Sequence, residues 1–294
     1  MIQEYSLLYA YVSQYVSGTD RILDKAFQVF TREHRSTGLL RTLTKVQQKI
    51  WISRISMVIR NLLDKNLSSF NERLLSNDQI FYACWTNQRV AKCFSRWQSS
   101  FLVFKGSNVF FFDQAPSPEF SFDDFHRCSD VYSIIEILIE DRSIDQRPFS
   151  FVLFVLNENR LESRYITFER QTEYEDFISN YQRALYLTVY STRIRSFICI
   201  YRQEICRLII DINKGFQIYQ NKTDHLLISF LFEQFHSSSN NGNDKIEFLF
   251  QQRQTSNDSD SVIRLGIQCR QLKRLIHVLN AFLIVKRIEQ DDSQ

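Results

Sequence analysis

Short apolar or alternating runs separated by polar turns lead into one longer segment with helical spacing, and this order occurs three times along the chain. Runs of a few residues with period two are typical of half-buried strands, whereas apolar residues at i, i+3 and i+4 line one face of a helix. The order therefore predicts three related groups of strands, each followed by one helix. We call them the first, second and third repeat.

The first repeat is short. Its pattern predicts a helix of about 18 residues that follows an N-cap at Thr44 and ends near Leu63. Three strands precede it, at Leu7–Gln14, Ala26–Thr31 and Gly38–Leu43. The helical stripe that we expect to be buried consists of Ile50, Trp51, Ile55, Val58, Ile59, Leu62 and Leu63. A closed small barrel needs more strands, so residues 1–65 are interpreted as the C-terminal half of a domain, and the polar residues 66–78 as a linker.

The second repeat covers residues 79–188. Its helix is expected at Glu173–Leu187, with Thr172 as the N-cap. The inner face of that helix is expected to hold Phe177, Tyr181, Ala184 and Leu185. The predicted strands are Ile80–Thr86, Phe101–Phe104, Val109–Asp113, Val131–Glu140, Phe149–Leu156 and Leu161–Phe168. This order favours a pleckstrin-homology barrel, in which seven strands are followed by a helix that fills the open corner of the sheet.

The third repeat covers residues 193–290 and has the same order. Its strands are predicted at Arg195–Tyr201, Ile205–Ile212, Phe216–Gln220, Leu226–Phe232, Lys245–Gln252 and Val262–Ile267. His236–Asp244 and Arg253–Asp260 are expected to be loops, and Cys269–Arg287 a helix. The buried stripe of that helix is Leu272, Leu275, Ile276, Leu279, Phe282 and Leu283. The expected fold class is therefore mainly β with C-terminal capping helices (α+β), as tandem pleckstrin-homology-like barrels of which the first is incomplete.

Composition narrows the classes of function. The net charge is +3 over 294 residues, without a concentrated basic run, so no nucleic-acid partner is expected. Only 6 glycines are present, which argues against large glycine-rich nucleotide loops, and no cofactor is expected. The longest apolar runs are far shorter than the roughly 20 residues that span a bilayer. The scattered cysteines, without a CxxC pair, indicate reduced thiols and a cytoplasmic location: Cys84, Cys93, Cys128, Cys199, Cys206 and Cys269.

Several short segments of the sequence, taken in order, resemble those of one protein family. In the first two repeats they are Ser13-Gln14-Tyr15, Gly18-Thr19-Asp20, Ala26-Phe27-Gln28-Val29, Thr37-Gly38, Trp51, Asp78-Gln79-Ile80, Trp85, Gly106-Ser107, Pro116 and Gln146-Arg147-Pro148-Phe149. In the third they are Asp211-Ile212, Gly215-Phe216, Phe230, Ser237-Ser238-Ser239, Gly242, Phe248-Leu249-Phe250-Gln251, His277, Phe282 and Lys286. Together they resemble syntrophins, the gamma type most closely. The resemblance begins midway through the first pleckstrin-homology domain of that family and ends in its unique C-terminal domain.

The resemblance implies an adapter and not an enzyme. Syntrophins bind dystrophin and dystrobrevin in the dystrophin-associated complex, near cortical actin at the inner face of the plasma membrane. By this likeness we expect a peripheral, cytoskeleton-associated protein with partners of the dystrophin and dystrobrevin type, and with actin as an additional candidate. Two departures stand out: nothing here resembles a PDZ carboxylate-binding loop, so no PDZ ligands are expected, and Phe177 stands where the family usually carries Trp.

A second function remains open, a peripheral module that binds phosphoinositides or other anionic membrane lipids. The segment after the first strand of the second repeat holds Arg89, Lys92 and Arg96, and Lys105 ends the following strand. Barrels of this type that bind phosphoinositides gather basic side chains there, because several charge-assisted hydrogen bonds must hold the headgroup. The alternative interpretation is a solvated loop, in which Trp97 simply belongs to the core.

Two further sets of side chains are candidates for metal binding or catalysis. Asp123, Asp124, His126 and Cys128 could approach a metal, although a solvated loop explains them equally well. His277 on the last helix is interpreted as a residue that makes one local hydrogen bond. No catalytic residue and no metal ligand is therefore assigned.

Overall fold

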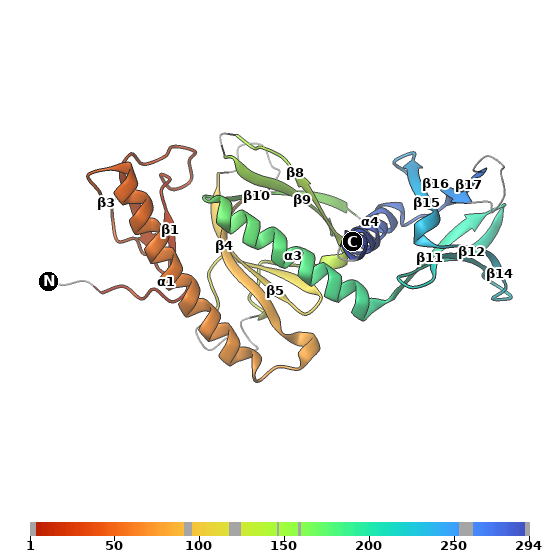
Figure 1. Ribbon diagram of the computed structural model, residues 1–294, viewed down its shortest axis with the longest axis horizontal. Coiled ribbons are helices and arrows are strands. Elements are labelled where there is room, and N and C mark those ends of the chain that lie inside the picture. Colours follow the sequence, from red (N-terminus) through yellow and green to blue (C-terminus); the bar gives the residue numbers. More distant parts are fainter. Residues whose placement is uncertain are drawn as a thin grey trace. The chain divides into compact units, whose positions relative to one another are not determined.

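The computed structural model describes residues 4–90, 96–117, 125–145, 147–157, 160–252 and 261–291 (Figure 1). The chain divides into two compact units, which are described separately. The N-terminal unit comprises Met1–Ile134, Ile139–Val155 and Glu162–Ala184. The C-terminal unit comprises Ile135–Leu138, Leu156–Leu161 and Leu185–Gln294.

The N-terminal unit begins with a small antiparallel sheet in the order β1-β2-β3, formed by β1 (Tyr11–Ser13), β2 (Ala26–Phe30) and β3 (Leu40–Arg41). Helix α1 (Lys45–Asn71) follows, and Thr44 caps it by accepting a hydrogen bond from the backbone N–H of Gln47, as predicted. The helix runs eight residues beyond Leu63, so the prediction of a linker from residue 66 is wrong as far as Asn71. The Asn71 amide donates to the carbonyl of Ile80 and accepts from its N–H, which fixes the end of α1 to the next strand.

Helix α1 has two apolar faces. Ile59 and Leu63 are buried as predicted, together with Ile52 and Leu67. Four residues of the predicted stripe, however, are exposed rather than buried: Ile50, Trp51, Val58 and Leu62. The buried face packs first on β1 and β2 and then, through Leu63 and Leu67, on the large sheet that follows. Within this chain three strands precede α1, and its second apolar face remains open to solvent.

A seven-stranded sheet forms the body of the N-terminal unit, in the order β7-β6-β5-β4-β10-β9-β8. Its strands are β4 (Ile80–Val90), β5 (Gln98–Lys105), β6 (Asn108–Phe112), β7 (Asp130–Ser133), β8 (Ile137–Asp141), β9 (Phe149–Asn157) and β10 (Arg160–Phe168). The run predicted as one strand, Val131–Glu140, is two strands separated by a 3-10 turn. Helix α3 (Gln171–Thr192) closes the barrel and already includes Thr172, which is therefore not the N-cap.

Strand β5 is covered on both faces. Leu102 and Phe104 alternate with Phe101 and Val103, and all four are fully buried. Phe104 packs against Phe177 of α3, with ring centroids 5.4 Å apart, whereas Phe101 and Val103 share a core cluster with Leu63 and Leu67 of α1. A strand buried on both faces reads as a continuous apolar run rather than an alternation. This explains the run from Phe101 to Phe104.

The core beneath α3 is aromatic. Phe177 is 1% exposed and stacks on Phe151, with centroids 4.9 Å apart. It also contacts the rings of Tyr82 and Phe168. Tyr181, Ala184 and Leu185 are buried as predicted. Phe177 thus fills the core at the position where the family that this sequence resembles usually has tryptophan.

The C-terminal unit holds a second seven-stranded sheet, in the order β14-β13-β12-β11-β17-β16-β15, with helix α4 (Leu272–Asp291) at its end. The strands are β11 (Ile194–Tyr201), β12 (Glu204–Asp211), β13 (Gly215–Gln220), β14 (Leu226–Phe230), β15 (Phe235–Asn240), β16 (Lys245–Gln252) and β17 (Ser261–Gln268). The prediction of a loop from His236 is wrong, because β15 pairs with β16 through Asn240. The predicted loop Arg253–Asp260 lies outside the described residues. The fold class, two helix-capped barrels after an incomplete one, is confirmed.

The tight turn between β12 and β13 requires its glycine. Gly215 has a φ of +77°, and a Cβ built on it would lie 2.1 Å from the carbonyl oxygen of Phe230. The next residue, Phe216, is buried among the rings of Phe232, Phe248 and Phe250. Any larger residue at 215 would therefore disturb both the turn and the aromatic core beside it.

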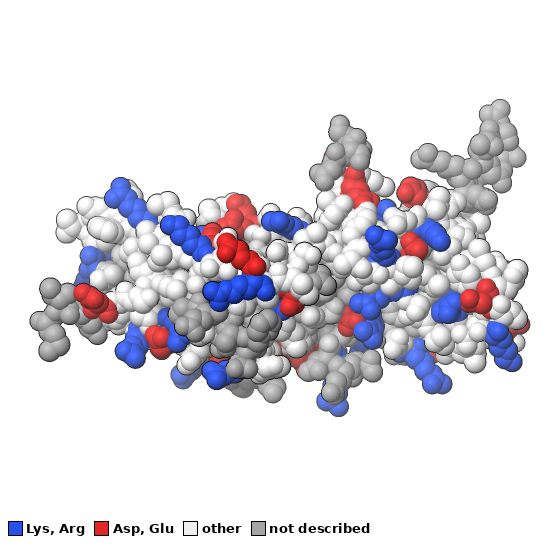
Figure 2. All heavy atoms as spheres, turned by 90° about the horizontal axis from the view of Figure 1, so that it is seen from below, with Lys and Arg blue, Asp and Glu red and all other residues white. Residues whose placement is uncertain are grey.

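Two properties of the surface bear on function. On the face shown in Figure 2, Lys and Arg side chains are interspersed with Asp and Glu, in agreement with the small net charge. Among the described residues, no helix combines the length and the apolar character needed to cross a bilayer.

Candidate functional site

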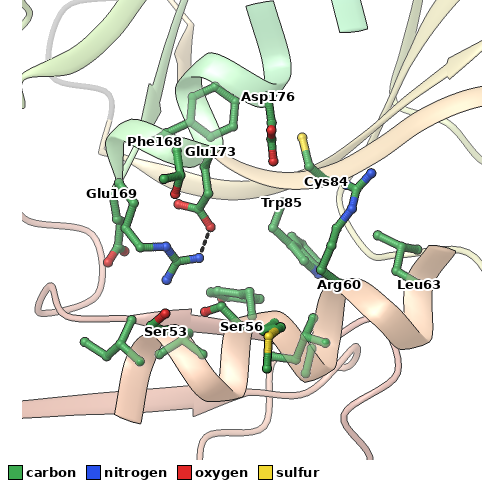
Figure 3. Close-up of a pocket in the computed structure, with 18 of the residues that line it drawn as sticks. Ser53, Ser56, Arg60, Leu63, Cys84, Trp85, Phe168, Glu169, Glu173 and Asp176 are labelled. Carbon is green, nitrogen blue, oxygen red and sulfur yellow. Dashed lines mark hydrogen bonds and ion pairs between the residues drawn. The ribbon is translucent and has the colours of Figure 1, made fainter. Parts of the chain in front are cut away.

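The N-terminal unit contains a cavity of about 640 Å³ (Figure 3). Strand β1 and helix α1 line one side of it, and strand β4 and the start of α3 line the other. Its apolar wall includes Leu63, Trp85 and Phe168. Glu169, Glu173 and Asp176 bring carboxylates to the side formed by α3, and Arg60 projects from α1 (Figure 3).

Two of these carboxylates already have partners. Glu169 accepts hydrogen bonds from the Ser13 hydroxyl at 2.5 Å and from the backbone N–H of Gln14 at 2.8 Å. Glu173 forms an ion pair with Arg170 one turn earlier. Burial nevertheless raises the pKa of Glu173 to about 7, against the attraction of Arg170, and it also raises the pKa of Glu169.

The basic and sulfur-bearing groups of the cavity are also held in place. Arg60 pairs with Asp64 at 3.0 Å, donates to the carbonyl of Ala83 at 3.2 Å and lies over the Tyr82 ring. Burial raises the pKa of the Cys84 thiol to about 12, so it stays protonated and is a poor nucleophile at neutral pH. The cavity therefore lies between helix α1 and the sheet, and its Cys84 thiol is not activated for covalent chemistry.

The raised pKa of Glu173 predicts a dependence of stability on pH. The folded chain holds the Glu173 proton more tightly than the unfolded chain, where the pKa is near 4.5, so this contribution to stability is complete below about pH 4.5 and is lost as the pH rises through about 7. Glu173→Gln should therefore raise the unfolding temperature at pH 8 and change it little at pH 5, as measured by thermal melts. Glu175→Gln, at an exposed position of the same helix, controls for the loss of one charge. A benefit that is equal at both pH values would contradict the prediction.

Of the four basic residues proposed for lipid binding, Lys105 lies apart from Arg89 and Arg96. Arg89 pairs with Asp145 at 2.9 Å, and its guanidinium lies 5.1 Å from the centre of the Trp97 ring. Arg96 is exposed near the same end of the β4–β5 hairpin, and Lys92 lies outside the described residues. Lys105 faces Ile80 at the opposite end of the hairpin and pairs with Asp78. Eight residues of strand separate the two ends, about 25 Å, so Lys105 cannot join Arg89 in holding one headgroup.

One buried arginine, Arg147, was named from the sequence only as part of the family resemblance and was given no role. The Arg147 side chain is 3% exposed, pairs with Asp20 at 2.8 Å and donates to the carbonyl of Thr19 at 2.7 Å. Its guanidinium stacks over Tyr15 at 4.3 Å and Trp97 at 4.7 Å. Trp97 itself is 5% exposed and belongs to the core. Arg147 and Asp20 are 127 residues apart in sequence, so no local pattern could have connected them.

The remaining candidates for chemistry form no described site. Asp123 and Asp124 lie outside the described residues, and Cys128 packs at the edge of the core cluster that includes Phe101. In the C-terminal unit, His277 is buried and its Nδ1 lies 2.7 Å from the carbonyl oxygen of Glu136. The prediction of a local hydrogen bond for this histidine is therefore wrong. Within the described part of the chain, no group of three or more His, Cys, Asp or Glu side chains is placed to hold a metal ion.

Comparison with known proteins agrees with this architecture. Residues 191–288 match the family model for the syntrophin C-terminal PH domain, which covers the sheet and helix of the C-terminal unit. Over 94% of its length the chain is 24% identical to human gamma-2-syntrophin, and over 95% it is 26% identical to human gamma-1-syntrophin. Residues 191–288 therefore belong to the syntrophin C-terminal PH domain family, and the chain as a whole is similar to gamma-syntrophins. It spans about half the length of these relatives, 54% and 53% respectively.

These matches indicate a family of adapter and scaffold proteins that carry pleckstrin-homology domains. Among solved structures, one match is the PH domain of human pleckstrin homology domain-containing protein family A member 5, at 12% identity. That match covers 38% of this chain and 81% of the other, with a TM-score of 0.30. The assignment depends on the sequence matches to syntrophins.

Proposed function

We propose that this protein is a cytoplasmic, non-enzymatic adapter that binds partners of the dystrophin and dystrobrevin type at the submembrane cytoskeleton, beside cortical actin. The relation to gamma-syntrophins along nearly the whole chain carries the proposal. The described cavity supports it, because Glu169 and Glu173 are engaged with Ser13 and Arg170 and the Cys84 thiol is protonated. The mechanism is surface complementarity, and PDZ ligands are not among the partners we expect.

The test is an isothermal calorimetric titration of the full chain with a recombinant coiled-coil region of a dystrobrevin. Saturable one-to-one binding is the expected result, with a dissociation constant in the micromolar range or tighter, which corresponds to about −8 kcal/mol or better. Absence of binding by a folded chain would disprove the proposal.

The second candidate is recruitment to anionic membranes. The observation in its favour is that Arg89 and the exposed Arg96 lie at one end of the same hairpin. A triple variant that neutralises Arg89, Lys92 and Arg96 should lose sedimentation with vesicles containing phosphoinositide while its titration with the dystrobrevin fragment is unchanged. If wild-type and variant chains sediment equally, these residues have no role at membranes. Lys105→Gln, at the far end of the hairpin, is the matched control.

A further inference from the structure

Branched apolar side chains are exposed on the outer face of the C-terminal unit. Ile198 and Ile200 of β11 are 57% and 43% exposed, and Ile205 of β12 is 60% exposed. Ile200 lies directly opposite Ile205 in the β11–β12 pair, and Ile198 lies opposite Arg207. The solvent face of an antiparallel sheet is normally polar, so a cluster of isoleucines there indicates a surface that binds another molecule.

A groove of about 510 Å³ adjoins these isoleucines. Ile200 and Gln203 form one wall, Asn240 and Asn241 form the other, and Gly266 of β17 lies between them. The second wall is rigid, because the Asn241 side-chain oxygen accepts hydrogen bonds from the backbone N–H groups of the three residues that follow Gly242, at 2.9 to 3.1 Å. A groove that is already ordered loses little entropy when a partner fills it.

Among the residues that the structure describes, none explains the glycine in this groove. Gly266 pairs with Glu247 in regular antiparallel register, and a Cβ built on it would meet no atom within 4 Å. It therefore differs from Gly215, whose backbone and neighbours exclude every other residue. Glycine weakens a strand, and in a strand interior it often marks a place where another molecule approaches closely. The missing side chain at 266 leaves room for an external partner.

The shape and charge of the surface select the occupant. Strands β14 and β15 form the edges of this sheet, and the end of β15 borders the groove, but Gly266 and the exposed isoleucines lie on the interior strands β11, β12 and β17. An added strand requires an edge, but an amphipathic helix lies on a face with its apolar residues downward. The exposed Lys245 and Arg264 flank Gly266 along β16 and β17 and outnumber Glu247 on the same face. These charges favour a helix with acidic flanks.

We propose that the face formed by Ile198, Ile200, Ile205 and the Gly266 groove is the docking surface for an amphipathic, acid-flanked helix of a partner protein. The isoleucines contact the apolar stripe of that helix, and the absent side chain at 266 lets one of its turns approach the sheet. This assignment rests on the proposed adapter function and names the surface that performs it.

Gly266→Val tests the surface without disturbing the fold, because the space above the Cα is open and valine favours strands. The variant should unfold at the same temperature as the wild-type chain or a higher one, yet bind the dystrobrevin coiled-coil fragment at least tenfold more weakly. Gly266→Ala should show a smaller loss, and Lys245→Glu should weaken binding in a manner that high salt diminishes. Ser229→Val, also at an exposed position of the same sheet but on β14, should bind like the wild type.

The outcomes separate the two proposals. Wild-type binding that Gly266→Val leaves unchanged would overturn the docking surface alone and leave the adapter function intact. Absence of wild-type binding would overturn the adapter function, and the docking surface with it. Light scattering of the free chain supplies a third result, since a dimer that Gly266→Val disrupts would show that the occupant is a second copy and not a partner helix.

Discussion

Leu63→Ala is expected to lower the free energy of unfolding of the N-terminal unit by about 2–5 kcal/mol, the usual cost of removing a buried leucine. Leu63 is 5% exposed and packs, in one cluster, with Ala83, Phe101 and Val103 of the large sheet. Urea titration followed by tryptophan fluorescence is a selective measurement, because all 3 tryptophans of the chain, Trp51, Trp85 and Trp97, belong to this unit.

The neighbouring leucine provides the control. Leu62 lies one position earlier on α1 and is 37% exposed, so Leu62→Ala should cost about 0.5 kcal/mol or less. Both variants remove the same atoms from the same helix, so differences in helix propensity cancel. Equal losses at the two positions would mean that the C-terminal half of α1 is not packed on the sheet.

Asp20→Ala is expected to destabilise the same unit by about 2–3 kcal/mol, because it leaves the buried guanidinium of Arg147 without a counter-charge. The Asp20 side chain is one-third exposed whereas that of Arg147 is 3% exposed, so the cost falls on the arginine that remains. The same fluorescence-detected urea titration measures it. The double variant Asp20→Ala, Arg147→Met should recover much of the loss, since an apolar side chain of similar length needs no partner.

Asp24→Ala is the matched control for Asp20. Asp24 pairs with Lys45 at 3.4 Å, but both side chains are about 70% exposed, and a pair of this kind contributes little. We expect a loss of about 0.5 kcal/mol or less. If Asp20→Ala behaved like Asp24→Ala, the turn around Gly18 would not be held on the second barrel by Arg147.

The sequence was sufficient to predict most of the strands and the capping helices, because most of them have their own apolar period. It was insufficient to choose the buried face of α1. Ile52, Ile59 and Leu63 each follow an apolar residue, namely Trp51, Val58 and Leu62. Adjacent positions on a helix are 100° apart, so the two sets form two faces of similar apolar character. Only the sheet that covers one of them decides between the faces.

The other differences between the predictions and the structure have equally specific physical causes. Strand β15 was predicted as a loop because Ser237, Ser238 and Ser239 carry no apolar signal, and an edge strand can form without one. The ion pair of Arg147 with Asp20 depends on a contact between distant segments. The separation of Lys105 from Arg89, in contrast, followed from the hairpin register and could have been deduced from the turn at Gly106. Grouping these residues by sequence proximity concealed that geometry.

Because β5 is buried on both faces, the choice of fragment for binding experiments matters. A fragment that begins after Asn71 would retain a complete second barrel but would expose Ala83, Phe101, Val103 and Phe112 to water. That aromatic surface would adsorb unrelated proteins in capture experiments, and positive results obtained with the shortened chain would overstate its range of ligands. Fragments used to map interactions should therefore retain residues 5–71.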